Sequence, residues 1–172
     1  DLRVSMLDTE ITSHHRSLDN VASDATTNAL LAQGFSLFGP EIQRARANNI
    51  VDVFGNELAK SPRSTISLGI NYEQALFDVG QLFISVQLNH RGSYQYRIFN
   101  NPSTDSVPAY TTVNAIARFK PVTGDWYVTL RAINATNADG VNARFTDVFG
   151  VGASSEELIP PRQLLLGLGL SF

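Results

Sequence analysis

The sequence contains no cysteine among its 172 residues. This absence excludes disulfide scaffolds, zinc sites with cysteine ligands and thiol catalysis. The sequence also lacks an excess of basic residues, because 13 lysines and arginines stand against 16 acidic residues, for a formal net charge of −3. We therefore expect no nucleic-acid partner, since domains that bind nucleic acids present clustered positive charge.

Long hydrophobic runs are missing as well. No stretch approaches the roughly 18 consecutive apolar residues of a membrane-spanning helix, although 43% of the residues are hydrophobic. A mean hydropathy of −0.06 suits a soluble all-β domain. It equally suits a transmembrane β-barrel, whose strands alternate lipid-facing and lumen-facing residues. Composition therefore leaves both classes open.

The start of the chain lacks an initiator methionine and the basic and apolar regions of a signal peptide. The segment Asp1–Met6 instead has the pattern of the middle of a strand. A chain of this length normally forms one domain with a sizeable core. We expect it to be a fragment whose first part is missing or has been removed.

Alternation with a period of two is what the sequence does have, and it predicts β-strands with two different faces. It is clearest near the C-terminus, where the even positions from 164 to 172 are all leucine or phenylalanine and the odd positions include glutamine, glycine and serine. In each alternating run, a register can be chosen that keeps charge off the apolar side. The predicted strands lie at about 1–11, 63–73, 81–92, 109–120, 125–134 and 162–172.

Short and long connections alternate along these strands. The turns near 74–80 and 121–125 are short, whereas the loops at 12–60, 93–108 and 135–160 are long. Outer-membrane barrels have short periplasmic turns and long extracellular loops, and loops of this length are unusual within a soluble meander. The sequence therefore predicts an all-β, antiparallel up-and-down meander with long extracellular loops.

Aromatic residues fall near both ends of the predicted strands. Membrane barrels carry girdles of aromatic side chains at the two interfaces of the bilayer, although strands are rich in aromatic residues in general. The predicted girdle consists of Tyr72, Phe119, Trp126 and Phe172 at the short-turn end and Tyr94, Tyr96 and Tyr110 at the long-loop end.

Six strands are too few for a closed membrane barrel, for which eight is the practical minimum. An open sheet edge would leave backbone N–H and C=O groups without partners in the hydrocarbon. We therefore interpret residues 1–172 as the C-terminal segment of a larger barrel, whose remaining strands lie before Asp1.

Residues with catalytic or metal-binding chemistry are few. His14 and His15 are adjacent, so in an extended segment they point to opposite faces and do not readily share a metal ion. The sequence has neither a G-x-S-x-G nucleophile motif nor a G-x-G-x-x-G nucleotide motif. We expect no enzyme activity, no catalytic residue, no cofactor and no metal site.

Two motifs are similar to those of a known family. Gly55 to Pro62, followed by a strand, has the pattern G-x-x-L-x-x-x-P, which resembles a motif found late in the barrels of TonB-dependent receptors. Trp126 to Leu130, with Asn134 and Asn137 after it, resembles the family's penultimate strand and its asparagine-rich exit.

The C-terminus strengthens the resemblance, because Pro160-Pro161-Arg162 leads into a final strand that ends at Phe172. The order and spacing of the motifs cover most of the chain from about Val53 onward. The first fifty residues match only as a strand and a loop. In addition, Leu168, Leu170 and Phe172 resemble the C-terminal signal that the outer-membrane assembly machinery recognises.

The resemblance implies the last six strands of a 22-stranded barrel whose N-terminal plug domain is absent from this chain. Such receptors bind a scarce ligand at the bacterial outer membrane, for example a siderophore, cobalamin or a carbohydrate, and import it with energy relayed by TonB. The expected partners are outer-membrane lipid, the TonB complex acting through the plug, the barrel-assembly machinery and the imported ligand. Without a plug and a TonB box, this polypeptide is not expected to transport on its own.

Arginines on the polar side of the strands are the candidate ligand contacts. Arg91, Arg118 and Arg131, together with Arg3, would line the lumen and could guide an anionic ligand or pair with plug carboxylates. The simpler interpretation is solvated interior charge. Arg162 has the lipid-facing parity at the extracellular end, where it could meet anionic headgroups.

Two other functions remain open. One is a passive outer-membrane channel or structural barrel, which a plug encoded upstream would exclude. The other is a soluble all-β binding domain, which predicts that the leucines at 164–170 pack against a second sheet. Ligand specificity would reside in the outer loops, and the loop at 12–60 contains an apolar stretch at Ala29–Phe38 and a predicted short helix at Glu41–Asn48.

Overall fold

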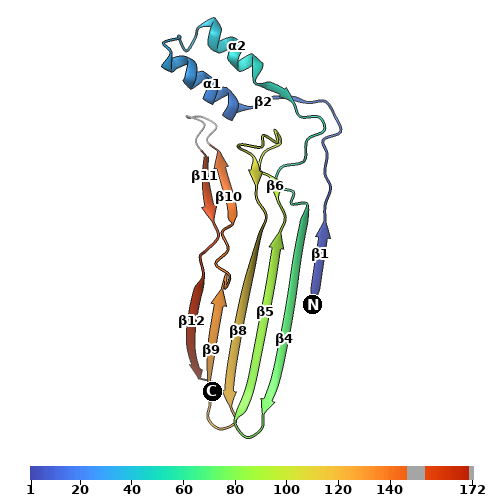
Figure 1. Cartoon of the computed structure of the whole chain (residues 1–172), viewed down its shortest axis with the longest axis vertical. Helices are drawn as coiled ribbons and strands as arrows, with labels where there is room; N and C mark the ends of the chain where they lie inside the picture. The colour runs from blue at the N-terminus through green and yellow to red at the C-terminus, as the bar shows by residue number, and fades with distance from the viewer. Residues whose placement is uncertain (147–153, 171–172) are drawn as a thin grey trace.

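A computed structural model describes residues 1–146 and 154–170 of the chain. Its main element is a six-stranded sheet with the order β1-β4-β5-β8-β9-β12, in which every neighbouring pair is antiparallel (Figure 1). Its strands are β1 (Leu2–Met6), β4 (Ser64–Leu76), β5 (Gly80–Arg91), β8 (Tyr110–Pro121), β9 (Trp126–Ile133) and β12 (Gln163–Leu170). The expected all-β up-and-down meander is confirmed. The first strand is shorter than the expected range 1–11.

The strand registers place all the apolar runs on one face of the sheet. Ile70 pairs with Val86, Val86 with Ala115, Ala115 with Ala132, and Ala132 with Leu164. Directly paired residues project from the same face, so this row crosses five strands on a single side. A slip of one residue in any pairing would turn one strand's apolar side chains to the opposite face. The five registers therefore define one continuous surface, called the apolar face below.

Short turns join the strands at one end of the sheet, which is the lower end in Figure 1. One turn connects β4 to β5 and the other connects β8 to β9, and the backbone N–H of Val122 in the second donates to the carbonyl of Val79 in the first at 3.2 Å. Gly124 has a φ of +99°, a conformation that residues with a side chain rarely adopt. The three long connections lie at the opposite end.

The long connections contain secondary structure of their own. The first contains β2 (Arg16–Leu18), α1 (Asn20–Ala32), α2 (Pro40–Asn48) and β3 (Ile50–Asp52). The second contains β6 (Tyr94–Gln95) and β7 (Ser106–Val107), and the third contains β10 (Val141–Thr146) and β11 (Ser154–Leu158). Each pair of short strands forms its own two-stranded sheet. The helix expected at 41–48 corresponds to α2.

Helices α1 and α2 begin at recognisable N-terminal signals. The side chain of Asp19 caps α1 by accepting a hydrogen bond from the backbone N–H of Ala22. Helix α2 begins with Pro40 and has Glu41 in its first turn and Arg46 in its last, an order that complements the helix dipole. None of the helices within the described residues is long and apolar enough to cross a membrane.

Buried hydrophobic side chains lie in the connections and not in the six-stranded sheet. They are Val21, Ile42, Ala45, Val53, Tyr94, Val107 and Val141. In contrast, Leu164, Leu166, Leu168 and Leu170 on β12 are 64–79% exposed. No second sheet packs against these leucines in the part of the chain that the structure describes, contrary to what a soluble binding domain predicts.

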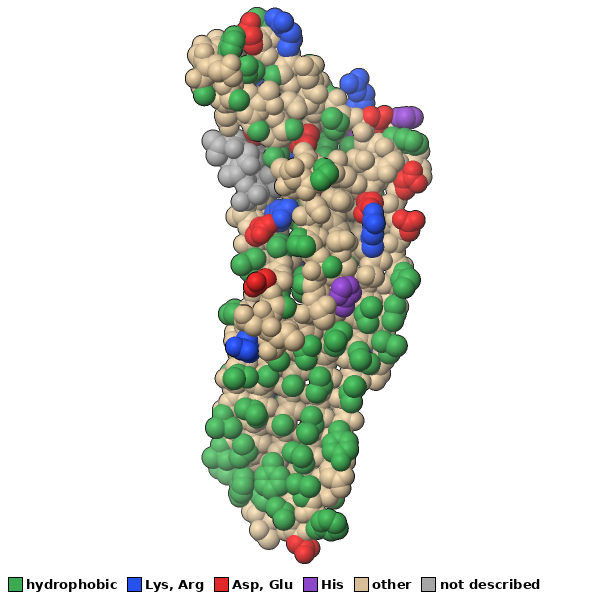
Figure 2. Space-filling view, in the orientation of Figure 1, with side chains coloured by type: hydrophobic (Ala, Val, Ile, Leu, Met, Phe, Trp, Pro, Cys, Tyr) green, Lys and Arg blue, Asp and Glu red, His purple; other side chains and the backbone are tan. Residues whose placement is uncertain are grey.

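Figure 2 shows how this apolar surface is bounded. Hydrophobic side chains gather over the lower part of the sheet, and most of the visible charged side chains lie above them, around the long connections. On the apolar face itself, the boundary towards the long connections is polar, because His90 Nδ1 and Thr111 Oγ1 lie 2.9 Å apart on paired positions of β5 and β8. The apolar face is therefore a band with a polar edge.

Candidate functional site

The face of the sheet opposite the apolar band, called the inner face below, is polar. Ser67, Asn89 and Thr112 form one row across β4, β5 and β8, and the Ser67 hydroxyl lies 3.0 Å from Asn89 Oδ1. The cations of the strands that share this face are Arg3, Arg91, Arg118, Lys120 and Arg131. Two carboxylates of the described residues lie on the inner face, Glu73 of β4 and Asp1 just before β1, which lies over Gly69.

The three arginines predicted to line the lumen thus lie on one face, at different heights. Arg91 lies near the long connections with its guanidinium 4.2 Å from the centre of the Tyr94 ring. Arg118 lies nearer the short turns, 4.1 Å from the centre of the Tyr127 ring. Neither these two nor Arg131 forms an ion pair with a carboxylate among residues 1–146 and 154–170.

Tyr127 is held between β8 and β12. It is paired with Gly169, and a Cβ atom added at Gly169 would lie 2.2 Å from Tyr127 Cζ. The ring therefore occupies the space above the glycine, while the Arg118 guanidinium covers its other side. Stacking of this kind combines apolar contact with cation–π attraction, and it requires a residue without a side chain at position 169.

Substitution of Gly169 by alanine in the complete protein is expected to displace the Tyr127 ring and to destabilise the folded sheet by about 1–3 kcal/mol, as overpacking does in well-packed sites. Gly167→Ala is the matched control, because its nearest contact is the small Thr129 hydroxyl at 2.8 Å. The midpoint of urea unfolding is measured for both variants from the fraction of folded protein on gels run without heating. Equal midpoints for the two variants would contradict this interpretation.

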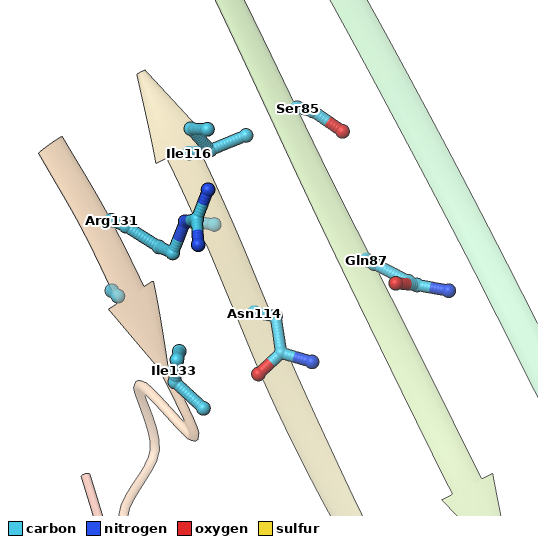
Figure 3. A pocket seen from close by; sticks show the side chains of 8 residues that line it. Ser85, Gln87, Asn114, Ile116, Arg131 and Ile133 are labelled. Atoms are coloured by element: carbon cyan, nitrogen blue, oxygen red, sulfur yellow. The ribbon is translucent and has the colours of Figure 1, made fainter. Parts of the chain in front are cut away.

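Arg131 of β9 lies at a shallow pocket on the inner face, with a volume of about 360 Å³. Figure 3 shows its side chain extending across β8, with Asn114 and Ile116 beside it and Gln87 and Ser85 on the next strand. Asn114 Oδ1 accepts a hydrogen bond from the backbone N–H of Asn134 at 2.9 Å. This contact fixes the orientation of the Asn114 amide, so its NH₂ group remains available as a donor.

A buried ion-pair network joins the first two long connections. Arg97 Nε donates to Asp105 Oδ1 at 2.7 Å, and Arg97 Nη1 donates to Asp19 Oδ1 at 2.8 Å. The three side chains are 12%, 0% and 7% exposed. Because Asp19 also caps α1, Arg97 fixes the start of that helix against the connection between β5 and β8.

Arg144 adds the third long connection to this assembly. Its side chain pairs with Glu156 of β11, and its Nη1 donates to the carbonyl of Thr104 at 2.7 Å. The β10–β11 hairpin is thereby attached to the segment that also carries Asp105. Buried or half-buried arginines therefore join all three long connections into one surface at this end of the sheet.

Sequence reasoning missed these residues. Asp19, Arg97 and Arg144 lie in no recognisable motif of the sequence. One signal was present, since Arg97 lies within Tyr96–Phe99, where an arginine among aromatic and aliphatic residues indicates a buried partner. Its partners could not be named, because Asp19 lies 78 residues away in the sequence.

Comparison with known protein families decides the assignment. Residues 17–138, more than half of the chain, match the family described as "TonB dependent receptor-like, beta-barrel". The chain belongs to this family. No curated protein and no solved structure matches the sequence. The family is one of receptors and transporters rather than enzymes. The match begins within the first long connection, whereas the motifs that resembled the family in the sequence begin only at about Val53.

In this receptor barrel, the segment that resembled the G-x-x-L-x-x-x-P pattern lies against the second long connection. Asn56 Nδ2 donates to the carbonyl of Ile98 at 2.8 Å, and the backbone N–H of Glu57 donates to Asn100 Oδ1 at 2.7 Å. Asn100 Nδ2 in turn donates to the carbonyl of Glu57 at 3.1 Å. The motif therefore attaches the segment that precedes β4 to the long connection between β5 and β8.

The asparagines after β9 determine the path of the backbone as it leaves that strand of the receptor barrel. Asn134 and Asn137 have φ values of +47° and +52°, which asparagine tolerates better than most residues. The Asn134 side chain is bonded to both the N–H and the carbonyl of Ala138 and also to the carbonyl of Pro160. Asn137 Oδ1 accepts from the backbone N–H of Arg162 at 3.0 Å. The two residues thus hold the exit of β9 beside the start of β12.

The aromatic residues predicted as a girdle divide into two groups in the receptor. Tyr72, Phe119 and Trp126 lie at the short-turn end of the apolar face, where the rings of Phe119 and Trp126 meet edge to face with centres 6.3 Å apart. Leu168 and Leu170 of the predicted assembly signal share that face. Phe172 lies outside the described residues.

The residues expected at the long-loop end do not face outward. Tyr94 is 3% exposed and packs against Val107 and Val141, with Tyr96 partly buried against the same cluster. Tyr110 pairs with Arg91 on the inner face. The physical reason is that β5 ends at Arg91, so Tyr94 lies in the separate β6–β7 sheet, where it packs with Val107 and Val141, while the register of β8 gives Tyr110 the parity of the inner face.

His14 and His15 lie in the first long connection. His14 Nδ1 lies 2.6 Å from Asp52 Oδ2, its ring stacks on Phe54, and the backbone N–H of His15 donates to Asp52 Oδ1. The described residues contain no group of three or more histidine or acidic side chains placed to hold a metal ion. The His14 side chain, followed by the backbone N–H of Phe54, lowers the pKa of the Asp52 carboxyl below its usual range.

A pH dependence of this loop follows. A carboxyl whose folded pKa is lowered stabilises the fold above its unfolded pKa of about 3.9, and that stabilisation is lost as the pH falls through the folded value. Hydrogen exchange of the β2–β3 hairpin, corrected for intrinsic rates, is expected to increase below about pH 4. Asp52→Asn should remove this pH dependence. A wild-type profile that is flat down to pH 2 would contradict the expectation.

Proposed function

We propose that the protein is an outer-membrane receptor that binds a scarce ligand outside the cell and imports it with energy supplied through TonB. The observation that carries the proposal is the continuous apolar face of the meander, in a chain that belongs to the TonB-dependent receptor barrels. The ligand class is that served by such receptors, namely a siderophore, cobalamin or a carbohydrate.

The exposure of the apolar face supports lipid as its partner. Strands β4, β5 and β8 have 13, 12 and 12 residues, and a tilted strand needs roughly 9–11 residues to cross the hydrocarbon core. Exposed leucines on β12 would destabilise a protein surrounded by water, but they are the normal surface of a barrel in a bilayer. The free edges of β1 and β12 would then pair with further strands of the complete barrel.

The arrangement of the long connections favours a receptor over a passive channel or structural barrel. The short turns would lie in the periplasm and the long connections outside the cell. Arg97 and Arg144 hold these connections in one arrangement, which reduces the entropy lost when a ligand orders them. TonB would act through the plug of the complete receptor. The barrel-assembly machinery would recognise the C-terminal strand with Leu168, Leu170 and Phe172.

The test uses the complete gene product expressed in a Gram-negative host. Purified outer membranes are analysed by gel mobility with and without boiling, and the detergent-extracted protein is passed over an immobilised periplasmic domain of TonB. The proposal predicts a heat-shifted outer-membrane band that is retained by TonB. A heat-shifted band that TonB does not retain would favour a passive channel, and protein recovered only in the soluble fraction would overturn the membrane assignment.

A further inference from the structure

The charges of the inner face differ from those of the rest of the chain. Although the chain has a formal net charge of −3, the inner face of the described residues carries five cations and two carboxylates, those of Glu73 and Asp1. One of those cations, Arg3, lies 3.9 Å from the Asp1 carboxylate. Glu73 lies in the row of Arg118 and lines a pocket with Arg118 and Lys120, whereas no carboxylate lines the pocket at Arg131.

The neighbours of Arg131 do not compensate its charge. The residues directly opposite it are Ile116 on β8 and Leu165 on β12. The register places Arg118 diagonally beside it, because Arg118 pairs with Thr129, and diagonal neighbours on a sheet lie only about 7–8 Å apart. The Arg118 guanidinium stacks on the Tyr127 ring, and neither arginine forms an ion pair within the described residues. An anion beside Arg131 would therefore be attracted by both positive charges.

The polar groups around the Arg131 pocket are hydrogen-bond donors or can act as donors. The Asn114 amide presents its NH₂ group because its oxygen is engaged by the Asn134 backbone. The side chains of Gln87 and Ser85 complete the polar lining, and no carboxylate lines the pocket (Figure 3). A guanidinium has a planar fork that matches the two oxygens of a carboxylate.

We propose that the Arg131 pocket binds a carboxylate group, with the Arg131 guanidinium as the charged donor and the Asn114 amide as a neutral one. The proposal rests on the proposed function, because the inner face must border the lumen for such a group to reach it. The carboxylate has two sources to distinguish, an acidic side chain elsewhere in the complete receptor and a free small carboxylate within the lumen. Both use the same recognition chemistry.

The experiment replaces Arg131 by lysine in the complete, detergent-purified receptor and treats the protein with a water-soluble carbodiimide. This reagent joins an amine to a carboxylate only when the two are in contact, and mass spectrometry identifies the product. Arg63→Lys is the positive control, because Arg63 pairs with Glu57. Arg46→Lys is the negative control, because Arg46 is exposed near the end of α2 and forms no ion pair within the described residues.

A crosslink between the new amine at position 131 and an aspartate or glutamate of the receptor would support the first source. The second source predicts that acetate protects Arg131 of the unsubstituted receptor from phenylglyoxal, a reagent specific for guanidinium groups, about tenfold more than it protects Arg46, because a bound carboxylate covers the guanidinium. If Arg63→Lys is crosslinked while position 131 gives no crosslink and Arg131 gains no protection from acetate, the proposal is overturned. The same samples are checked for heat-shifted mobility, so failure of the pocket is distinguishable from failure of the barrel assignment.

Discussion

Replacement of Ile70 by arginine in the complete receptor is expected to destabilise the folded barrel by about 2–4 kcal/mol, the cost of an arginine near the middle of the lipid-facing surface. Ile70 is 59% exposed and lies within the row that crosses five strands of the apolar face. Its exposed position rules out overpacking of a protein core as the cause. The cost would come from moving a cation into hydrocarbon.

Asn71→Arg is the matched control, because it places the same side chain on the adjacent residue and the opposite face. Asn71 pairs with Ser85 on the inner face, and Glu73 lies two residues further along the same strand face, so an arginine there remains solvated. Urea unfolding in lipid vesicles, followed by gel mobility without boiling, measures both variants. Equal destabilisation, or a larger effect of Asn71→Arg, would show that the apolar face does not contact lipid.

Replacement of Arg97 by methionine is expected to destabilise the outer loops by about 3–5 kcal/mol, the usual effect of removing one partner from a buried ion pair. The Asp105 carboxylate is fully buried and Asp19 nearly so, and both would lose their cationic partner. Methionine keeps much of the apolar volume of the arginine stem. The loss of charge and hydrogen bonds should therefore dominate the effect.

The measurement is hydrogen exchange of peptides from the three long connections, with peptides from β4 and β5 as internal references. Exchange should increase in all three connections of Arg97→Met and stay unchanged in the strands, whereas Arg46→Met, which removes an exposed arginine, should alter neither. In the Arg97→Met background, Asp105→Asn should restore part of the protection because it removes an uncompensated buried charge. Increased exchange confined to the connection between β5 and β8 would contradict the proposed joining of the loops.

The strands of the sheet were predictable because each has two chemically different faces. In β12, leucine occupies every even position, and the odd positions are glutamine or glycine except for Leu165, so this period of two survives any arrangement of the neighbouring strands. The alternation within each strand predicts which of its residues face the apolar side, and the observed pairing of the strands tests that prediction. Ile70, Val86 and Leu164 fall in one row although they come from separate segments.

The loops were less predictable because their order comes from contacts between distant segments. Helix α1 buries Val21, Ser23 and Thr27, a mixed set that gives no apolar stripe in the sequence. Tyr94 lies only three residues after the end of β5, so the sequence suggested a girdle position. Its burial depends on Val107 of β7 and Val141 of β10, which lie in later segments of the chain. Arg131 was identified from strand parity, but the register of three strands was needed to show that it forms no ion pair within the described residues.

The arginines that join the long connections have a consequence for antibodies raised against the receptor. Because Asp19, Arg97 and Arg144 belong to three separate connections that are fixed to one another, an antibody that binds the outer surface would contact a discontinuous epitope. Synthetic peptides copied from a single connection would lack the partners that shape it and would be poor immunogens for the native surface. Grafting one connection onto another barrel would fail for the same reason unless its two neighbours were transferred with it.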